Sequence, residues 1–86
     1  MTKRRVDYSR QAAKVLMRVD RATSARIRAK IAQLADDPAS LANNITPLKG
    51  GEGLSRLRVG DWRVIYTETL VIVSVVQIGP RGGVYE

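Results

Sequence analysis

The sequence predicts a single α+β domain over residues 1–86, with the element order β-α-α-β-β-β. Three observations lead to this fold class. Apolar residues recur at helical spacing between residues 10 and 36, and three strand-like apolar runs follow between residues 54 and 78. A Gly60-Asp61 pair separates the first two runs, as in a hairpin. We therefore expect an N-terminal strand, an αα-hairpin and then an antiparallel sheet of three main strands, around one modest core.

Residues 3–8 are predicted to form the first strand, with Val6 and Tyr8 on one side. Ser9 is a suitable N-cap for the helix that follows. The apolar stripe of this helix consists of Ala12, Val15, Leu16 and Val19.

Asp20 is placed to begin a second helix after a short connection, which makes the pair an αα-hairpin. The apolar stripe of this helix consists of Ile27, Ile31 and Leu34, and the basic residues Arg26, Arg28 and Lys30 fall elsewhere on its surface. Pro38 ends the helix, because the residue before a proline avoids helical backbone angles. Residues 39–53, which contain several glycines, are predicted to form a loop between the helices and the sheet.

The hairpin over residues 54–66 carries the strongest functional signal. Gly60-Asp61 fits a type II′ turn, which favours glycine first and fixes the register. The predicted cross-strand pairs are Val59–Trp62, Arg58–Arg63, Leu57–Val64 and Arg56–Ile65. One face is then apolar and is expected to pack on the helices, while the other carries Arg56, Arg58 and Arg63. An arginine opposite an arginine costs stability, so this basic patch is a candidate site for an anionic ligand.

The remaining strands are predicted over residues 62–68 and 70–78. The last is apolar on both faces, as a central strand would be, and Gly79-Pro80 is expected to end it.

The charge balance favours an anionic partner. The net charge is +7, from 15 basic and 8 acidic side chains, and the first 30 positions are especially basic. Nucleic acid, an acidic protein and an anionic membrane surface are all partners of this kind. The chain has no His and no Cys, so we expect no metal site, no cofactor and no disulfide. It also lacks an apolar run long enough for a membrane helix and an apolar segment typical of a signal peptide, so we expect a cytoplasmic protein.

In this order and spacing, several short segments resemble the RelE/ParE superfamily of type II toxins. They are Asp37-Pro38, Leu48-Lys49-Gly50, the run Leu57-Arg58-Val59-Gly60-Asp61-Trp62-Arg63-Val64-Ile65-Tyr66, Ile78-Gly79-Pro80-Arg81 and Val84-Tyr85. The resemblance covers nearly the whole chain and implies a RelE-like fold. In the RelE branch it implies a ribosome-dependent mRNA interferase, an endoribonuclease that inhibits translation and causes growth arrest, neutralised by a cognate antitoxin.

By this resemblance, the catalytic residues are Arg56, Arg63, Arg81 and Tyr85. Two further residues are candidates for RNA binding because of their positions, Arg58 on the same face of the hairpin and Lys49 in a glycine-rich loop. Arginines supply fixed positive charge in a geometry that suits phosphate. A tyrosine can stack on a base, orient the 2′-hydroxyl, or accept its proton if nearby arginines lower its pKa.

Two alternatives remain open. The chain departs from the RelE pattern at Leu54, where a basic residue is common, and around Arg81, which Pro80 and Gly82 flank. The ParE branch, whose members poison DNA gyrase and need no nuclease site, is therefore the first alternative. A non-toxic module that binds RNA or protein on the same scaffold is the second.

Overall fold

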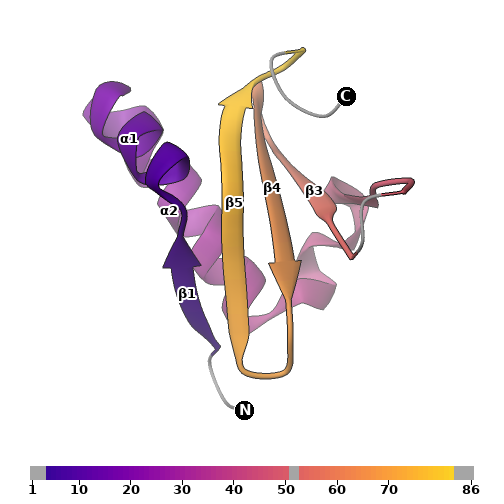
Figure 1. Ribbon diagram of the computed structural model, residues 1–86. Helices are drawn as coiled ribbons and strands as arrows, with labels where there is room; N and C mark the ends of the chain where they lie inside the picture. Colours follow the sequence, from indigo (N-terminus) through magenta and orange to yellow (C-terminus); the bar gives the residue numbers. More distant parts are fainter. Residues whose placement is uncertain (1–3, 51–52, 83–86) are drawn as a thin grey trace.

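The computed structural model describes residues 4–50 and 53–82. In order, its elements are β1 (Arg5–Tyr8), α1 (Arg10–Arg18), α2 (Arg21–Asp36), the 3₁₀ helix η1 (Pro38–Asn44), β2 (Ile45–Pro47), β3 (Ser55–Val59), β4 (Trp62–Glu68) and β5 (Ile72–Pro80). In the described residues the strands form one five-stranded sheet in the order β1-β5-β4-β3-β2, and α1 and α2 lie on one side of it (Figure 1). The predicted α+β class is confirmed.

Both helices begin at the predicted capping residues. The Ser9 hydroxyl accepts a hydrogen bond from the Ala12 amide at 3.1 Å, and the Asp20 carboxylate accepts one from the Thr23 amide at 3.0 Å. The Thr23 hydroxyl also donates to Asp20, and these bonds hold the pKa of Asp20 below its usual value. Helix α2 ends at Asp36, just before the Asp37-Pro38 pair.

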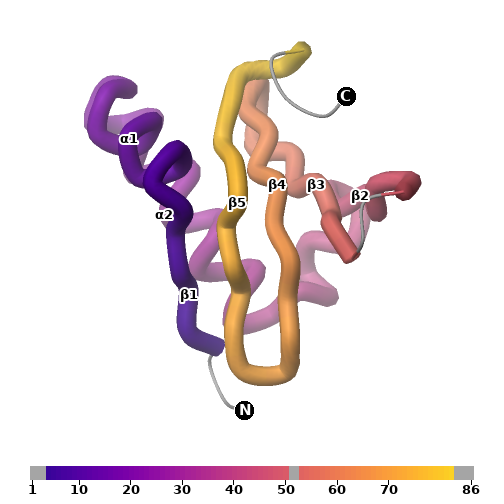
Figure 2. The backbone as a smooth tube through the Cα atoms, in the orientation of Figure 1, coloured from indigo at the N-terminus to yellow at the C-terminus, as the bar shows by residue number. Residues whose placement is uncertain are grey.

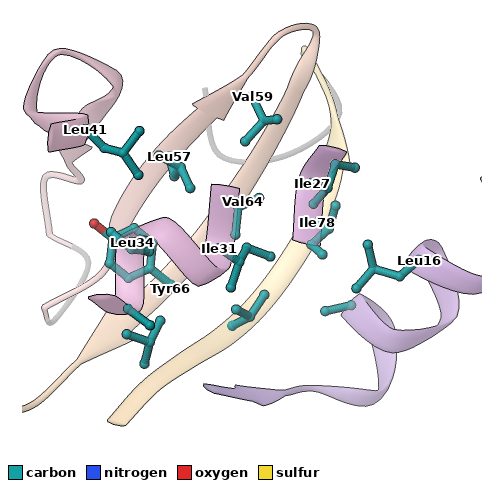
Figure 3. Close-up of a cluster of buried hydrophobic side chains, with 14 residues drawn as sticks. Leu16, Ile27, Ile31, Leu34, Leu41, Leu57, Val59, Val64, Tyr66 and Ile78 are labelled. Carbon is teal, nitrogen blue, oxygen red and sulfur yellow. The ribbon is translucent and has the colours of Figure 1, made fainter. Parts of the chain in front are cut away.

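The core lies between α2 and the sheet, as the apolar stripes predict (Figure 3). Ile27, Ile31 and Leu34 of α2 are fully buried, as are Leu57 and Val64 on the sheet. Leu16 of α1 joins the same cluster, while Trp62 packs at its margin and stays partly exposed.

Tyr66 is the largest side chain that is fully buried. Among the residues that the structure describes, its hydroxyl has no hydrogen-bond partner, although Ser55 lowers its pKa. Burial, followed by the negative charge of Glu68, dominates and raises the pKa of Tyr66 to about 12. The protonated form is therefore the one that the fold accommodates.

Strand β1 pairs in parallel with β5, from Arg5–Ile72 to Tyr8–Val75. Next to this ladder, the Arg4 side chain connects α2 to β4. It donates to the carbonyl oxygens of Leu34 at 2.7 Å and Ala35 at 3.2 Å, near the C-terminal end of α2, and to the Glu68 carboxylate at the end of β4. One residue of the basic N-terminal segment therefore has a structural role.

Strand β5 runs through Gly79 and Pro80, so the prediction that this pair ends the strand was wrong. The register explains why proline is tolerated there. The Ile78 amide points away from β4 and donates to the side-chain oxygen of Gln11, and the Pro80 nitrogen faces the same open edge. The Gln11 amide also donates to the Ile78 carbonyl at 2.9 Å, so one side chain satisfies the backbone of Ile78 beyond the end of β1.

A β-bulge changes the phase of β5. Ile65 pairs with Gln77 and Tyr66 pairs with Val75, which leaves Val76 as the extra residue. In a regular strand Val75 and Ile78, three positions apart, would face opposite sides of the sheet. The extra residue lets both side chains reach the core. The strand is central, as predicted, but its second face is only partly covered, since Val76 is 41% exposed.

The prediction of a loop over residues 39–53 was wrong for its first part. Residues from Pro38 to Asn44 form η1, which buries Leu41, and β2 follows as an edge strand beside β3 (Figure 2). The cross-strand pairs are Ile45–Leu57, Thr46–Arg56 and Pro47–Ser55. The register places Ile45 on the core face and Thr46 on the opposite face, beside Arg56.

Candidate functional site

The β3–β4 hairpin has the predicted register. Val59 lies opposite Trp62, Arg58 opposite Arg63, Leu57 opposite Val64 and Arg56 opposite Ile65. Gly60 has a φ of +59°, in the left-handed region that the first residue of a type II′ turn requires. Arg56, Arg58 and Arg63 therefore share the face of the sheet that points away from the helices, which we call the arginine face.

The three arginines of this face differ in exposure. Arg63 is only 8% exposed, Arg56 is half-buried and Arg58 is exposed. The Nη1 group of Arg63 donates to the carbonyl oxygens of Gly60 and Trp62, both at 3.0 Å. These bonds fix the guanidinium against the turn, so its charge has a set position before any ligand arrives.

A pocket of about 120 Å³ opens on the arginine face. Its lining comes from η1 and from three strands, and consists of Asn43, Asn44, Thr46, Arg56, Arg58 and Arg63. We call it the arginine pocket. Its side chains offer guanidinium, amide and hydroxyl donors around a small volume, which suits an anion with several acceptor oxygens, such as a phosphate group.

Sequence reasoning missed the asparagine and threonine side of this pocket. Asn44 donates to the Arg58 carbonyl at 3.4 Å and so connects η1 to β3. The alternation of Asn44, Ile45 and Thr46 was the available signal, because one apolar residue between two polar ones is typical of a short edge strand.

Arg81 lies just beyond β5, and its amide donates to the Asp61 carbonyl at 2.6 Å. Within the strand, Arg63 pairs with Gly79 and Trp62 with Pro80. The backbone hydrogen bond to Asp61 places Arg81 next to the β3–β4 turn. Gly79, opposite Arg63, adds no side chain there.

The structure does not bring all the predicted site residues together. Lys49 lies in an exposed turn after β2, and it is not among the residues that line the arginine pocket. Tyr85 lies outside the described residues, so its role stays a prediction.

Within residues 4–50 and 53–82, no three His, Asp or Glu side chains are grouped so that they could hold a metal ion. In the same residues, no helix has the length and apolar character needed to cross a membrane.

The family model for the ParE toxin of the type II toxin–antitoxin system parDE matches residues 6–85. The chain belongs to this toxin family. Apart from Arg5 at the start of β1, the matched span includes every strand and helix of the described residues, together with the arginine pocket. No curated protein matches the sequence of this toxin significantly.

The fold of the toxin is also that of RelE and YafQ. The archaeal RelE–RelB complex from Pyrococcus horikoshii matches with a TM-score of 0.78 and 26% identity, covering 96% of this chain and 100% of the matched chain. The E. coli DinJ–YafQ toxin–antitoxin complex gives 0.75 and 18%, covering 99% and 100%. The intact E. coli RelBE complex gives 0.70 and 20%, covering 90% and 95%. The toxin is therefore RelE-like in structure.

Proposed function

We propose that this toxin is a RelE-like mRNA interferase, which cleaves messenger RNA on the ribosome in the cytoplasm. The arginine pocket is the observation that supports it most directly. A buried, hydrogen-bonded Arg63 and a half-buried Arg56 lie beside amide and hydroxyl groups in a volume of about 120 Å³.

The reaction that fits these groups is attack of the RNA 2′-oxygen on the adjacent phosphorus. The new 2′-O–P bond forms as the P–O5′ bond breaks, which yields a 2′,3′-cyclic phosphate and a 5′-hydroxyl. The 2′-hydroxyl gives up a proton, and the leaving 5′-oxygen gains one. In this proposal Arg56 and Arg63 stabilise the extra negative charge on the phosphate oxygens as the bonds exchange.

Arg81 is assigned to the leaving oxygen and Tyr85 to the 2′-hydroxyl. Arginine keeps its proton at any physiological pH, so Arg81 acts by charge and not as a literal acid. Arg58 and Lys49 are assigned to RNA binding outside the reacting phosphate, Arg58 from the rim of the pocket.

We further propose that a cognate antitoxin neutralises the toxin by laying an acidic helix or extended segment over its basic surface. Two findings support this partner. The net charge is +7, and the similar RelE and YafQ structures include complexes of those toxins with RelB and DinJ.

Transcript 5′-end mapping after expression in cells tests the proposal. We expect cuts within translated codons for the wild type and none for Arg56→Ala or for Arg63→Ala combined with Tyr85→Phe. Arg10→Ala, which removes an equal charge from the exposed surface of α1, is the matched control and should leave the cuts unchanged. Circular dichroism checks that each variant is folded.

Intact transcripts together with accumulated gyrase–DNA cleavage complexes would contradict the proposal in favour of gyrase poisoning. Normal growth with neither effect would favour a non-toxic binding module.

A further inference from the structure

Helix α2 contributes a cation to the β3–β4 turn from the side opposite the arginine pocket. A Cβ atom built on Gly60 would lie 3.0 Å from Nη2 of Arg26 and 3.5 Å from its Cζ. The Arg26 guanidinium therefore lies close over Gly60, and a side chain at position 60 would require Arg26 to shift. The sequence assigned Arg26 only to the polar surface of α2.

Two further hydrogen bonds hold the same turn, and one of them comes from the arginine face. Arg63 donates to the Gly60 carbonyl, and the Arg81 amide donates to the Asp61 carbonyl. The guanidinium groups of Arg26 from α2 and Arg63 from β4 therefore both lie at this two-residue turn, and the backbone of Arg81 is bonded to it. Asp61 is the one acidic residue in that turn, so the local charge is strongly positive.

Arg26 differs in its surroundings from Arg28, its neighbour on α2. Arg28 donates to the Ser24 hydroxyl at 3.2 Å, and its charge partly offsets the rise that burial produces in the pKa of Tyr8 on β1. Arg26 is exposed and forms no ion pair with a carboxylate in the described part of the chain. It is positioned by its contact with the turn and has charge available for a ligand.

We infer that Arg26 extends the arginine pocket across the β3–β4 turn and binds a further phosphate of the strand whose phosphate occupies the pocket. The ligand is single-stranded RNA, whose backbone passes from the arginine face over Gly60-Asp61 towards α2. Arg26 acts as a binding residue and takes no part in bond exchange. In its choice of ligand this inference rests on the proposed function, but its test requires no cleavage.

The test measures binding of a fluorescein-labelled oligouridine by anisotropy over a range of salt concentrations. Each phosphate contact on a single strand contributes about 0.7 to the slope of log K against log salt. We expect Arg26→Gln to lower that slope by about 0.7 and Arg28→Gln, which removes the same charge from the same helix, to leave it unchanged. Arg26→Lys should restore the wild-type slope.

Equal slopes for Arg26→Gln, Arg28→Gln and the wild type would overturn the inference. So would unchanged RNA binding combined with weakened antitoxin binding, which would assign Arg26 to the protein partner. If Arg26→Gln is unstable, Arg26→Ala provides the same comparison with a residue of high helix propensity. A wild type that binds RNA through Arg26 but leaves transcripts intact would refute the proposed nuclease and support the inference.

Discussion

The side chains on one face of β3, β4 and β5 are apolar and covered by α2, whereas the other face carries three arginines of β3 and β4 around a small pocket. The first face holds Leu57, Val64 and Ile78, all fully buried. The second places Arg58 directly opposite Arg63, a pairing that costs stability. The five residues of strand β3 therefore alternate between two roles: those on one face stabilise the core, and those on the other face are available to bind a ligand.

The largest expected effect comes from the covered face. Ile31→Ala removes a fully buried side chain from α2 and should lower the free energy of unfolding by about 2–5 kcal/mol. Val76→Ala is the control on the opposite face, where the side chain is 41% exposed, and should change stability by about 0.5 kcal/mol or less. Urea denaturation measures both, and equal losses would show that the two faces do not differ.

Alkaline pH should weaken the covered face through Tyr66. Its pKa of about 12 in the fold exceeds the ordinary value of 10.0, so the unfolded chain loses its proton first. Stability is then retained below pH 10 and falls as pH rises from 10 to 12, by about 2–3 kcal/mol at most. Denaturation of the wild type and of Tyr66→Phe at pH 9 and pH 11.5 checks this. The wild type should lose more unfolding free energy between the two pH values than the variant does, and equal losses would show that Tyr66 is not the cause.

Substitution of Arg4 tests whether an arginine outside the arginine face stabilises the fold. Arg4→Met removes its bonds to the carbonyl oxygens of Leu34 and Ala35 and should cost about 2 kcal/mol of stability. Arg5→Met, which removes the same charge from an exposed side chain, should cost about 0.5 kcal/mol or less. Thermal denaturation distinguishes the two, and a similar cost for both would refute a structural role for Arg4.

The smallest effect has the opposite sign. Arg58→Thr relieves the repulsion with Arg63 and inserts a residue that favours strands, so stability should rise by about 0.2–1 kcal/mol. RNA binding should weaken in the same variant. Arg56→Thr, opposite Ile65, relieves no such repulsion and should not be stabilising. A loss of stability in Arg58→Thr would mean that the arginine face supports the fold.

Prediction from the sequence was most accurate for features that depend on residues close together in the chain, such as turns, helix caps and the alternation of side chains along a strand. The hairpin register followed from one glycine at a turn, and the helix boundaries followed from Ser9, Asp20 and Pro38. What failed depended on contacts between distant segments. The short strand β2 forms because β3 offers it a partner, and Pro80 stays in a strand because its nitrogen faces an open edge.

The residues of the candidate site also fall into those that local sequence could predict and those that it could not. Arg56 and Arg63 were predicted to share a face because they belong to one hairpin, and they do. Asn43 and Thr46 were missed because their positions depend on contacts between distant segments: η1 places Asn43, and the pairing of β2 with β3 places Thr46 opposite Arg56. Lys49 was a candidate because of its glycine-rich loop, and it is not among the residues that line the pocket.

The parallel ladder between β1 and β5 has a consequence for how the chain acquires its shape during synthesis. Arg5 to Tyr8 pair with Ile72 to Val75, and Gln11 bonds to Ile78, across nearly the whole length of the chain. The first strand therefore has no partner until the last one has left the ribosome. A truncated chain that ends before Ile72 lacks both the central strand and the support for β1, so we expect incomplete copies of this toxin to remain unfolded and harmless.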